Sequence, residues 1–407
     1  MPPQSDVSPA PLPTAETHHN AVRSRRMSGV DPLDIIAVAD SADALGPDVL
    51  RMENLDTDLP PPATALRATQ RALDALLPDA SSYLPFTGKA DLRAAISDRL
   101  LTQSGRAYDS ASQVVVASGG LATLFAALLA TVDHGDAVVL TDPCYAGFIA
   151  RVRLAGALPV HVPLRAETGH WRLDTDALDR VQAAKAIITM SPSMPTGHIM
   201  NESEWQAVER LVERTGAWVL HDAAMERLTF DGQPLSTPLT RPALAARTIV
   251  IGSAAKEYRM IGWRIGWAAG PTDIMRDVGS AVVYSTVVPS GFAQAGVAAA
   301  MRDPDDGVAR ATATWQARRD ALLAQLDGLP VIRPDGGWSL LVDAHAVGTT
   351  ARLLSRTLLE HGRIAATPMT AWGSQVAPNH VRLVYAREPV ERLHDVRRRF
   401  DHALHES

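Results

Sequence analysis
The sequence predicts an α/β protein whose mostly parallel central sheet has helices on both faces, joined to a smaller α+β domain. Two observations predict this class. Short apolar runs alternate with helical segments through the middle of the chain, as in parallel sheets buried on both faces. Each run also ends in a small or polar residue, and ligands of such sheets bind beyond the carboxyl ends of the strands. The expected strands are 114–118, 137–143, 186–192, 218–222 and 248–253.

The chain has 407 residues, which suggests two or three domains. Changes in composition and in the pattern of apolar residues divide it into four segments. Residues 1–25 are rich in proline and contain little to bury, so we expect a disordered tail. Residues 26–60 are expected to form the N-terminal part of the small domain, and residues 61–301 the large domain. After about residue 302 a long helix leads into mixed strands and helices, which we assign to the C-terminal small domain, 302–407.

Helices are expected wherever apolar residues recur at helical spacing between turn signals. The last expected helix carries Arg397, Arg398 and Arg399, which we interpret as a solvated face. The expected helices begin at about residue 32 and continue with 63–77, 91–103, 121–130, 202–215, 308–326, 351–361 and 390–404.

The composition argues against several classes of protein. The chain is 46% hydrophobic and 21% charged, which is ordinary for a globular protein. A net charge of −6 argues against nucleic acid or an anionic membrane as a partner, and no apolar run reaches membrane-spanning length. The only cysteine, Cys144, excludes an internal disulfide, and we interpret it as a small buried residue. Because a single cysteine fits a reducing compartment and no signal peptide is apparent, we expect a cytoplasmic protein.

One lysine stands out after the last expected strand. Lys256 follows small residues, and a lysine that is partly buried there has a lowered pKa and a lone pair free for carbonyl chemistry. An isolated lysine is more often an ordinary surface residue. Ser253 and Arg264 flank this one, however, and could hold a phosphate beside it. The combination suits pyridoxal 5′-phosphate bound to the lysine as a Schiff base.

Other chemically suggestive residues lie near the expected strand ends, and each has an ordinary structural alternative. Gly119-Gly120 before a helix suits a phosphate, although a strand-to-helix turn uses glycine as readily for its geometry. Asp222 is either a helix cap or the partner of a cation such as a protonated pyridine nitrogen. Tyr145 either offers an aromatic face to a ligand or packs in the core. Arg382, in an apolar strand, would be costly to bury without an anion such as a substrate carboxylate.

Together these residues resemble the class I/II aminotransferases, the fold-type I enzymes of pyridoxal phosphate, over roughly residues 26–400. Ser253-Ala-Ala-Lys256 resembles the Schiff-base signature of that family, and Arg264 matches its phosphate-binding arginine. Asp222 falls on the aspartate that contacts the pyridine nitrogen. The resemblance therefore implies that these residues bind the cofactor.

The resemblance extends to positions farther from the lysine. Gly120 and Leu121, with the glycine before them, match the backbone phosphate cradle, and Tyr145 matches the aromatic residue that stacks on the cofactor ring. Tyr83 resembles the tyrosine that reaches the phosphate of the neighbouring subunit, which implies a homodimer. Arg382 matches the arginine that binds the α-carboxylate of the substrate.

Three positions depart from the family pattern. Met194 precedes Pro-Thr-Gly where the family has asparagine, and Met225 lies three residues after Asp222 where the family has tyrosine. Both family residues donate hydrogen bonds to the phenolic oxygen of the cofactor, and a methionine side chain cannot donate one. Leu55 lies about where a substrate-facing glycine is expected. Cofactor binding at this set of positions, including both methionines, remains implied.

The resemblance implies a homodimeric aminotransferase that moves an amino group between an L-amino acid and a 2-oxo acid. Lys256 and Asp222 would be the catalytic residues, and Arg382 would bind the substrate. Other chemistry on the same scaffold, namely elimination, decarboxylation or oxidation, is the alternative. A regulatory or binding protein that merely retains the cofactor is a third class, which no helix-turn-helix or basic extension in the sequence supports.

The substrate itself is a separate question. The alanine- and arginine-rich composition is typical of high-GC actinobacteria, and the chain resembles aminotransferases of non-proteinogenic amino-acid pathways in antibiotic biosynthesis. One such pathway makes enduracididine, a cyclic guanidino amino acid. Glu53, Asp56 and Asp58 could pair with a guanidinium near the expected substrate entrance. They could equally form a solvated turn, which is the simpler interpretation.

Overall fold

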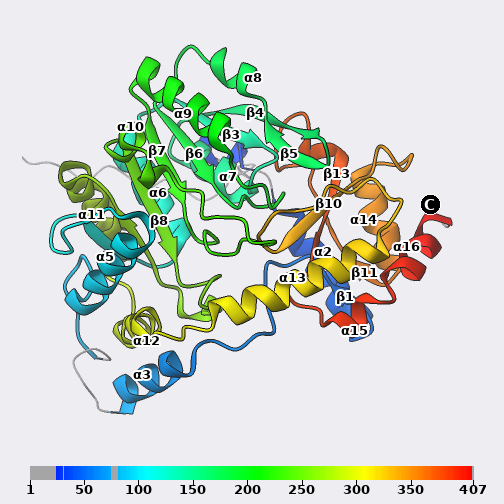
Figure 1. The fold of residues 1–407 in the computed structure, drawn as a ribbon, viewed down its shortest axis with the longest axis horizontal. Coiled ribbons are helices and arrows are strands. Elements are labelled where there is room, and N and C mark those ends of the chain that lie inside the picture. The colour runs from blue at the N-terminus through cyan, green and yellow to red at the C-terminus, as the bar shows by residue number, and fades with distance from the viewer. Residues whose placement is uncertain (1–23, 31, 75–80, 406–407) are drawn as a thin grey trace, which may run out of the picture.

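The structure is a computed structural model in which residues 24–30, 32–74 and 81–405 are described (Figure 1). Nearly all of the expected disordered tail, and the end of the helix expected at 63–77, lie outside these residues. The described chain begins with Ser24, whose hydroxyl accepts a hydrogen bond from the Met27 N–H at the start of α1 (Arg25–Ser28).

The centre of the molecule is an eight-stranded sheet. Its strands are β2 (Val114–Ala117), β3 (Ala137–Asp142), β4 (Leu158–Glu167), β5 (His170–Leu173), β6 (Ala186–Met190), β7 (Trp218–Asp222), β8 (Thr248–Ser253) and β9 (Gly266–Ala269). They lie in the order β2-β9-β8-β7-β6-β3-β4-β5. The pairings place six of them in one direction and reverse only β9 and β5. The prediction of a mostly parallel α/β sheet is therefore confirmed.

Three of these strands, β4, β5 and β9, were not predicted from the sequence. β5 and β9 have only four residues each, and β9 begins at a glycine in a segment that the pattern does not mark as a strand. β4 contains Pro159 and Pro163, which lower strand propensity. The prolines are tolerated because residues 158–163 pair only with β3, while β5 pairs with residues 164–167, so both prolines lie on an open edge. Three of the expected strands also end one or two residues early, at 117, 142 and 190.

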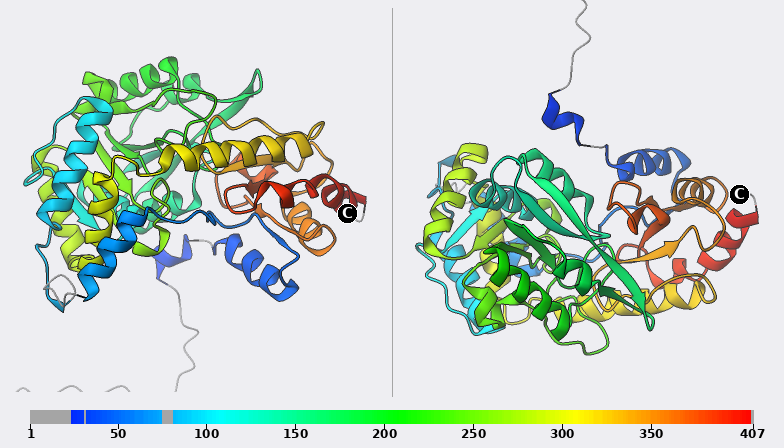
Figure 2. Two further views of the ribbon diagram at one scale, coloured as in Figure 1. Left: turned by 60° about the horizontal axis from the view of Figure 1, so that its bottom comes forward. Right: turned by 90° about the horizontal axis from the view of Figure 1, so that it is seen from above.

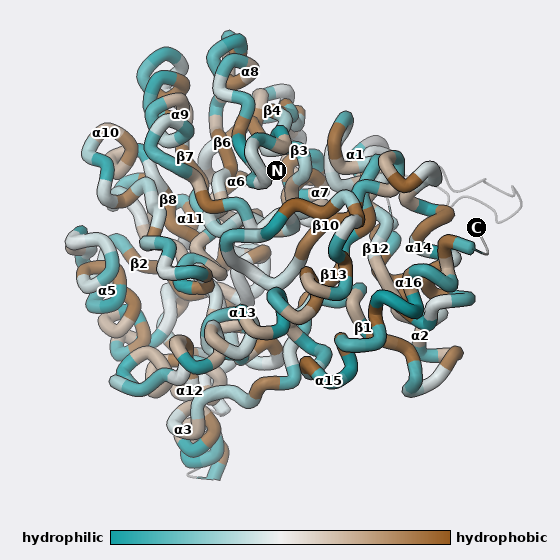
Figure 3. The backbone as a smooth tube through the Cα atoms, turned by 45° about the vertical axis from the view of Figure 1, so that its right-hand side comes forward, coloured by the Kyte–Doolittle hydropathy of each residue, from teal (hydrophilic) through white to brown (hydrophobic). Residues whose placement is uncertain are grey.

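Two layers of helices cover the sheet (Figure 1). One layer contains α6 (Gly120–Thr131), α7 (Ala146–Leu154) and α11 (Thr272–Thr286), and the other contains α5 (Ala90–Ser104), α9 (Glu202–Thr215) and α12 (Gly291–Arg302). Val138 and Leu140 of β3 pack in the first layer, whereas Val139 between them packs with α9. This alternation follows from the two-residue period of a strand. Figure 3 shows hydrophilic and hydrophobic segments alternating along α9, because only one face of this helix is buried.

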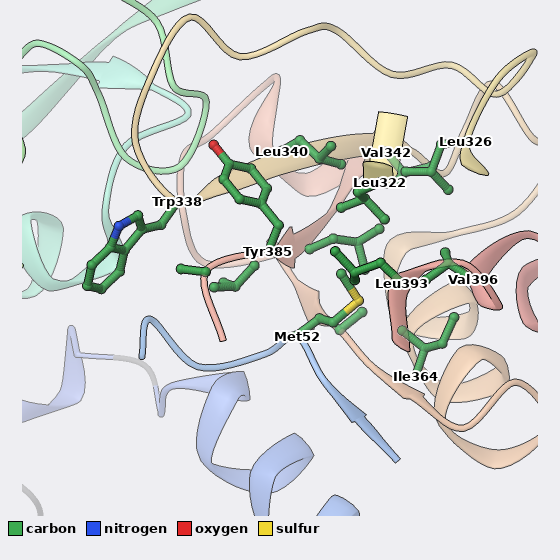
Figure 4. Packing of buried hydrophobic residues seen from close by; sticks show 14 of the residues in the cluster. Met52, Leu322, Leu326, Trp338, Leu340, Val342, Ile364, Tyr385, Leu393 and Val396 are labelled. Carbon is green, nitrogen blue, oxygen red and sulfur yellow. The ribbon is translucent and has the colours of Figure 1, made fainter. Parts of the chain in front are cut away.

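A smaller α+β part lies beside the large sheet. Its three-stranded sheet has the order β10-β13-β12, and the N-terminal strand β1 pairs in parallel with β11. Figure 2 shows α13 extending from the large sheet to this part, and Figure 4 shows its core around Trp338, Leu340 and Tyr385. The domain limits expected from the sequence stay a prediction. The elements are α2 (Asp34–Leu45), β1 (Leu50–Arg51), α13 (Val308–Gln325), β10 (Ser339–Asp343), α14 (Ala351–Glu360), β11 (Ile364–Ala365), β12 (Thr367–Pro368) and β13 (His380–Val384).

The helix expected at 390–404 is two helices, α15 (Val390–Leu393) and α16 (Val396–His405). Asp395 lies at the break, where its carboxylate accepts hydrogen bonds from the side chains of Arg398 and Arg399. The expected solvated face is correct for Arg397 and Arg398, but Arg399 is partly buried, with 14% of its side chain exposed. Unlike Arg398, Arg399 also donates to the backbone carbonyl oxygens of Asp48 and Arg363, and these contacts explain why it leaves the solvated face.

The remaining helices are short or lie at the edges. They are α3 (Ala63–Asp74), α8 (Thr175–Asp179) and α10 (Pro242–Ala245). Within residues 24–30, 32–74 and 81–405, no helix is both long and apolar enough to span a membrane.

The capping box of α9 gives a test of the fold. The Asn201 side chain accepts the Glu204 N–H at 3.0 Å, and the Glu204 carboxylate accepts the Asn201 N–H at 2.6 Å. Asn201→Ala removes one half of this exchange and should lower the free energy of unfolding by about 1 kcal/mol. Denaturant titration measures the loss, and Asn201→Asp, which keeps an acceptor, is the matched control. Equal stability of the alanine variant and the wild type would contradict the assignment.

Candidate active site
A cavity of about 350 Å³ lies at the carboxyl ends of β6, β7 and β8, against β13 of the smaller sheet. Larger hollows of about 430, 490 and 560 Å³ elsewhere contain none of the residues predicted from the sequence. The cavity contains ten of the twelve predicted residues, namely Gly120, Leu121, Tyr145, Met194, Asp222, Met225, Ser253, Lys256, Arg264 and Arg382. Two predicted residues, Gly119 and Tyr83, do not line it.

Lys256 follows β8 and is mostly buried, so it is not an ordinary surface lysine. Its Nζ donates a hydrogen bond to the Leu55 carbonyl oxygen at 2.7 Å and lies over the Trp338 ring, 4.7 Å from the centroid. Burial lowers the pKa of the Lys256 amine to about 8. A substantial fraction of the amine is therefore neutral near physiological pH and can act as a nucleophile or base.

Asp222 ends β7 and is 8% exposed. Its carboxylate accepts the Ala224 N–H at 2.9 Å, which is the local cap that the sequence offered as one interpretation. The same side chain also lines the cavity, as the other interpretation requires. Burial raises the pKa of Asp222 to about 6, against the hydrogen bond from Ala224 and the charges of His221 and Lys256. A cation brought close to this carboxylate would favour its charged form.

The turn between β2 and α6 forms a cradle for an anion. Gly119 has φ 98°, and α6 begins at the next residue, so N–H groups at the helix N-terminus are free to bind a ligand. A side chain on Gly266 of β9 would lie 2.5 Å from the backbone of Gly119 and Gly120, so this close approach requires glycine. Ser253 packs against Gly120 on the other side.

Arg264 adds a positive charge to this cradle. A Cβ on Gly119 would lie 2.7 Å from Arg264 Nη2, so the guanidinium rests against the glycine backbone. Its Nη1 donates to the Ile261 carbonyl oxygen at 2.9 Å, and the side chain is exposed to the cavity. No described carboxylate pairs with it. The N–H groups at the start of α6, a hydroxyl and an arginine without a described carboxylate partner together fit a phosphate group.

Arg382 of β13 is fully buried. Its Nη2 donates to the Glu53 carbonyl oxygen and, at 3.2 Å, to Thr367 Oγ1. Its Nη1 contacts Met194 Sδ at 3.6 Å, and Nε hydrogen bonds to no described group. Burial lowers the pKa of the guanidinium to about 10. No described carboxylate forms an ion pair with it, so this group remains available to an anionic ligand that enters the cavity.

The aromatic and methionine positions also meet in the cavity. Tyr145 precedes α7, and its ring makes edge contacts with Phe148 and Trp372, each at a centroid distance of 5.5 Å. It both packs against neighbours and faces the cavity, so the two interpretations of this residue are compatible. Met194 and Met225 are 5% and 1% exposed, and both line the cavity. Their thioethers offer a ligand no hydrogen-bond donor.

Tyr83 lies apart from this group, with 81% of the residue exposed. Its expected contact with a neighbouring subunit stays a prediction. Cys144 is 3% exposed, which confirms the interpretation as a small buried residue, and burial raises the pKa of its thiol well above the usual value.

The acidic segment that includes Glu53, Asp56 and Asp58 differs from both sequence interpretations. Glu53 is fully buried, and its carboxylate accepts hydrogen bonds from Arg51 at 2.6 and 2.9 Å. Asp58 pairs with Arg318 at 2.7 Å. Asp56 pairs with Arg387 at 3.5 Å. The solvated turn is therefore wrong for Glu53. All three acids already have guanidinium partners, two of them more than 200 positions away, which the local sequence cannot reveal.

Several cavity residues were not predicted from the sequence. Apart from that of Asn54, their side chains are apolar and look like ordinary core residues, and only chain topology places them beside the lysine. The one sequence feature that could have pointed to a cavity residue is Trp372, a large aromatic residue in a glycine-containing loop. These residues are Leu33, Ile35, Asn54, Phe148, Met190, Ala224, Ala255, Ile261 and Trp372.

Comparisons with known proteins agree with this geometry. The family model described as aminotransferase class I and II matches residues 51–400. The chain is 30% identical over 352 residues to an arginine–pyruvate transaminase of Pseudomonas aeruginosa, covering 85% of this chain and 88% of the relative. It is also 30% identical to an aspartate aminotransferase of Geobacillus stearothermophilus, covering 91% and 98%.

Solved structures show the same fold. N-succinyldiaminopimelate aminotransferase from Mycobacterium tuberculosis superposes with a TM-score of 0.87 at 30% identity, covering 94% of this chain and all of the other. Aspartate aminotransferase from Thermus thermophilus with maleate gives a TM-score of 0.86 at 29% identity, covering 94% and 99%.

The lowered pKa of Lys256 can be tested on the protein without added cofactor. The chain has three lysines, so an amine-acylating reagent and peptide mass spectrometry can follow Lys256 beside Lys185 as an internal reference. Only the neutral amine reacts, so labelling of Lys256 should rise through a midpoint near pH 8. A midpoint near the usual lysine value, above pH 10, would contradict the effect of burial.

Proposed function
This chain belongs to the class I and II aminotransferases, enzymes that move an amino group between amino acids and 2-oxo acids, and we propose that its cavity performs this reaction with pyridoxal 5′-phosphate. The observation that carries the assignment to this cavity is the set of charges it encloses. A lysine with a pKa of about 8 lies with two arginines that have no described carboxylate partner. An amine, a phosphate cradle and a second anion site are the groups that this cofactor and an amino acid need.

The residues that line the cavity would then divide the tasks of binding the cofactor among them. Gly120 and Arg264 would hold the phosphate, with Gly119, Leu121 and Ser253 shaping the cradle. Asp222 would face the pyridine nitrogen and keep it protonated. When bound, the cofactor supplies an electron-withdrawing ring that stabilises negative charge on the α-carbon of the substrate.

The substrate would be oriented and its proton moved by two further residues. Arg382 would bind the α-carboxylate and thereby fix the direction of the α-carbon bonds. Lys256 would bind the cofactor aldehyde at rest. After release by the incoming amino group, its amine would carry a proton from the α-carbon, because its pKa lies close to physiological pH.

A guanidino amino acid, of the enduracididine type found in antibiotic biosynthesis, is the substrate class that we propose. The arginine–pyruvate transaminase among the relatives acts on a guanidino amino acid, as its name states. Phe148 also lines the cavity, and planar guanidinium groups stack well on aromatic faces. The single cysteine supports a location in the cytoplasm.

Loss of hydrogen-bond donors at Met194 and Met225 favours a second candidate, namely elimination, decarboxylation or oxidation of an amino acid by the same residues. The two candidates differ in the fate of the amino group. Transamination keeps it on the cofactor until a 2-oxo acid accepts it, whereas elimination and oxidation release ammonia and decarboxylation releases carbon dioxide.

The experiment is a single turnover of protein loaded with pyridoxal phosphate. With L-arginine alone we expect one equivalent of 2-oxo acid per site and no ammonia, followed by repeated turnover when pyruvate is added. Ammonia or carbon dioxide formed in step with consumption of the amino acid would instead support the second candidate. Lys256→Ala should lose the covalent link, so borohydride should fix no cofactor to it. Cofactor fixed to that variant would show that the lysine assignment is wrong.

We also propose that the enzyme is a homodimer in which Tyr83 contacts the cofactor phosphate of the neighbouring subunit. Its exposure in the single chain supports this role, because a tyrosine with 81% exposure leaves its hydroxyl free to cross an interface. The nearby Phe86 is also exposed, at 51%, and a dimer would cover such apolar surface.

Light scattering should therefore report a dimer, and Tyr83→Phe should speed loss of cofactor during dialysis because a donor to the phosphate is removed. Tyr284→Phe is the matched control, since Tyr284 is likewise exposed, at 92%, and has no expected contact with the phosphate. A monomer that retains cofactor as tightly as a dimer would remove the basis for this role.

A further inference from the structure
The buried guanidinium of Arg382 raises the question of what fixes its orientation. Its Nη2 is held by the Glu53 carbonyl oxygen and the Thr367 hydroxyl. On the other side Nη1 meets only the weak acceptor Met194 Sδ, and Nε has no described partner. Hydrogen bonds to one corner leave the plane of the group free to tilt about that corner.

The Trp372 ring supplies the missing constraint. The central carbon of the Arg382 guanidinium lies over this ring, 4.5 Å from its centroid. Trp372 is 2% exposed and lines the cavity. An aromatic face attracts a cation without accepting its in-plane hydrogen bonds, so the free N–H groups of Arg382 remain available to a ligand.

We propose that Trp372 is a positioning residue that orients Arg382 for the substrate carboxylate, an inference that rests on the proposed role of Arg382. The ring also makes the 5.5 Å edge contact with Tyr145, the proposed stacking residue. Trp372 therefore links the anion site on β13 to the aromatic face beside α7. Its substitution should weaken recognition of the carboxylate specifically.

The loop that carries Trp372 is fixed by Asp142, the last residue of β3. This buried carboxylate accepts the backbone N–H groups of four successive loop residues. The Trp372 carbonyl oxygen accepts the Cys144 N–H at 2.9 Å, and Gly373 lies so close to Asp142 that a side chain there would clash. The ring is thus anchored to the end of a strand in the large sheet, although Arg382 belongs to the smaller one.

The test isolates the carboxylate by comparing amino acids with amines that lack it. Holoenzyme is titrated with L-arginine and agmatine, and with L-alanine and ethylamine, and cofactor absorbance gives each apparent dissociation constant. The carboxylate preference is the constant for the amine divided by that for the amino acid. General damage to the site changes both constants and leaves the ratio unchanged.

Trp372→Met keeps much of the volume but removes the ring, and should lower the carboxylate preference about tenfold, which corresponds to about 1.4 kcal/mol. Trp372→Phe keeps an aromatic face and should retain most of the preference. Trp171→Met is the matched control, because Trp171 is 3% exposed and its ring contacts His380 rather than the cavity. If the methionine variant does not fold, the phenylalanine variant is compared with Trp372→Tyr, and loss of preference in both would overturn the ring-face mechanism.

Arg382→Gln separates this inference from the function on which it rests. If the wild type shows no carboxylate preference, or if Arg382→Gln leaves it unchanged, the proposed role of Arg382 is wrong and the role of Trp372 falls with it. If Arg382→Gln abolishes the preference while Trp372→Met retains it, Arg382 keeps its role and Trp372 does not position it. Loss in both, with retention in Trp372→Phe, supports the proposal.

Discussion
The structure depends on keeping positive charge inside the protein without neutralising it. Two other buried arginines have carboxylate partners, Arg319 in Asp231 and Arg318 in Asp58. The buried Arg259 instead donates to backbone carbonyl oxygens. Arg382 is fully buried and has no described carboxylate partner. Its N–H groups meet a carbonyl, a hydroxyl, a sulfur atom and a ring face, which satisfy donors without cancelling the charge. A carboxylate in their place would stabilise the resting protein and compete with an anionic ligand.

The same principle extends to Lys256. A backbone carbonyl and the face of Trp338 hold its amine, and Asp222 approaches it only as part of the same cavity wall. Burial therefore lowers the pKa of the lysine to about 8 and raises that of the aspartate to about 6, because no direct pairing offsets it. The pKa values of the two groups therefore lie closer together than their ordinary values do, which suits a site that transfers protons near neutral pH.

Much of this arrangement could be predicted from the sequence, and the limits have physical reasons. Buried parallel strands have a strong local signature, so β3, β7 and β8 were placed almost residue by residue, and the polar residues at their ends marked the cavity. Local pattern failed for β9, which is short and begins with Gly266, and for β4, whose prolines are tolerated only on an open edge.

The sequence also could not reveal contacts between residues that lie far apart in the chain. The sequence around Glu53 gives no sign of the fold that buries it, and the loop around Trp372 gives no sign that its ring lies over Arg382. Such contacts join elements through the tertiary fold. They are therefore invisible to spacing and composition, whereas the lysine and its glycines are recognisable from local pattern alone.

The path of the N-terminal segment has a consequence for how the site comes into being. The carbonyl oxygens of Glu53 and Leu55 hold Arg382 and Lys256, which lie 329 and 201 positions later. During synthesis these acceptors emerge from the ribosome long before the cations that they bind. In the same way, β1 is made long before β11, the strand with which it pairs. The large sheet has all its strands once residue 269 has been made, but the cavity cannot close until β13 is complete at residue 384. A nascent chain would thus contain every strand of the large sheet while its site is still incomplete, and would become competent for its ligand only after residue 384 has been made.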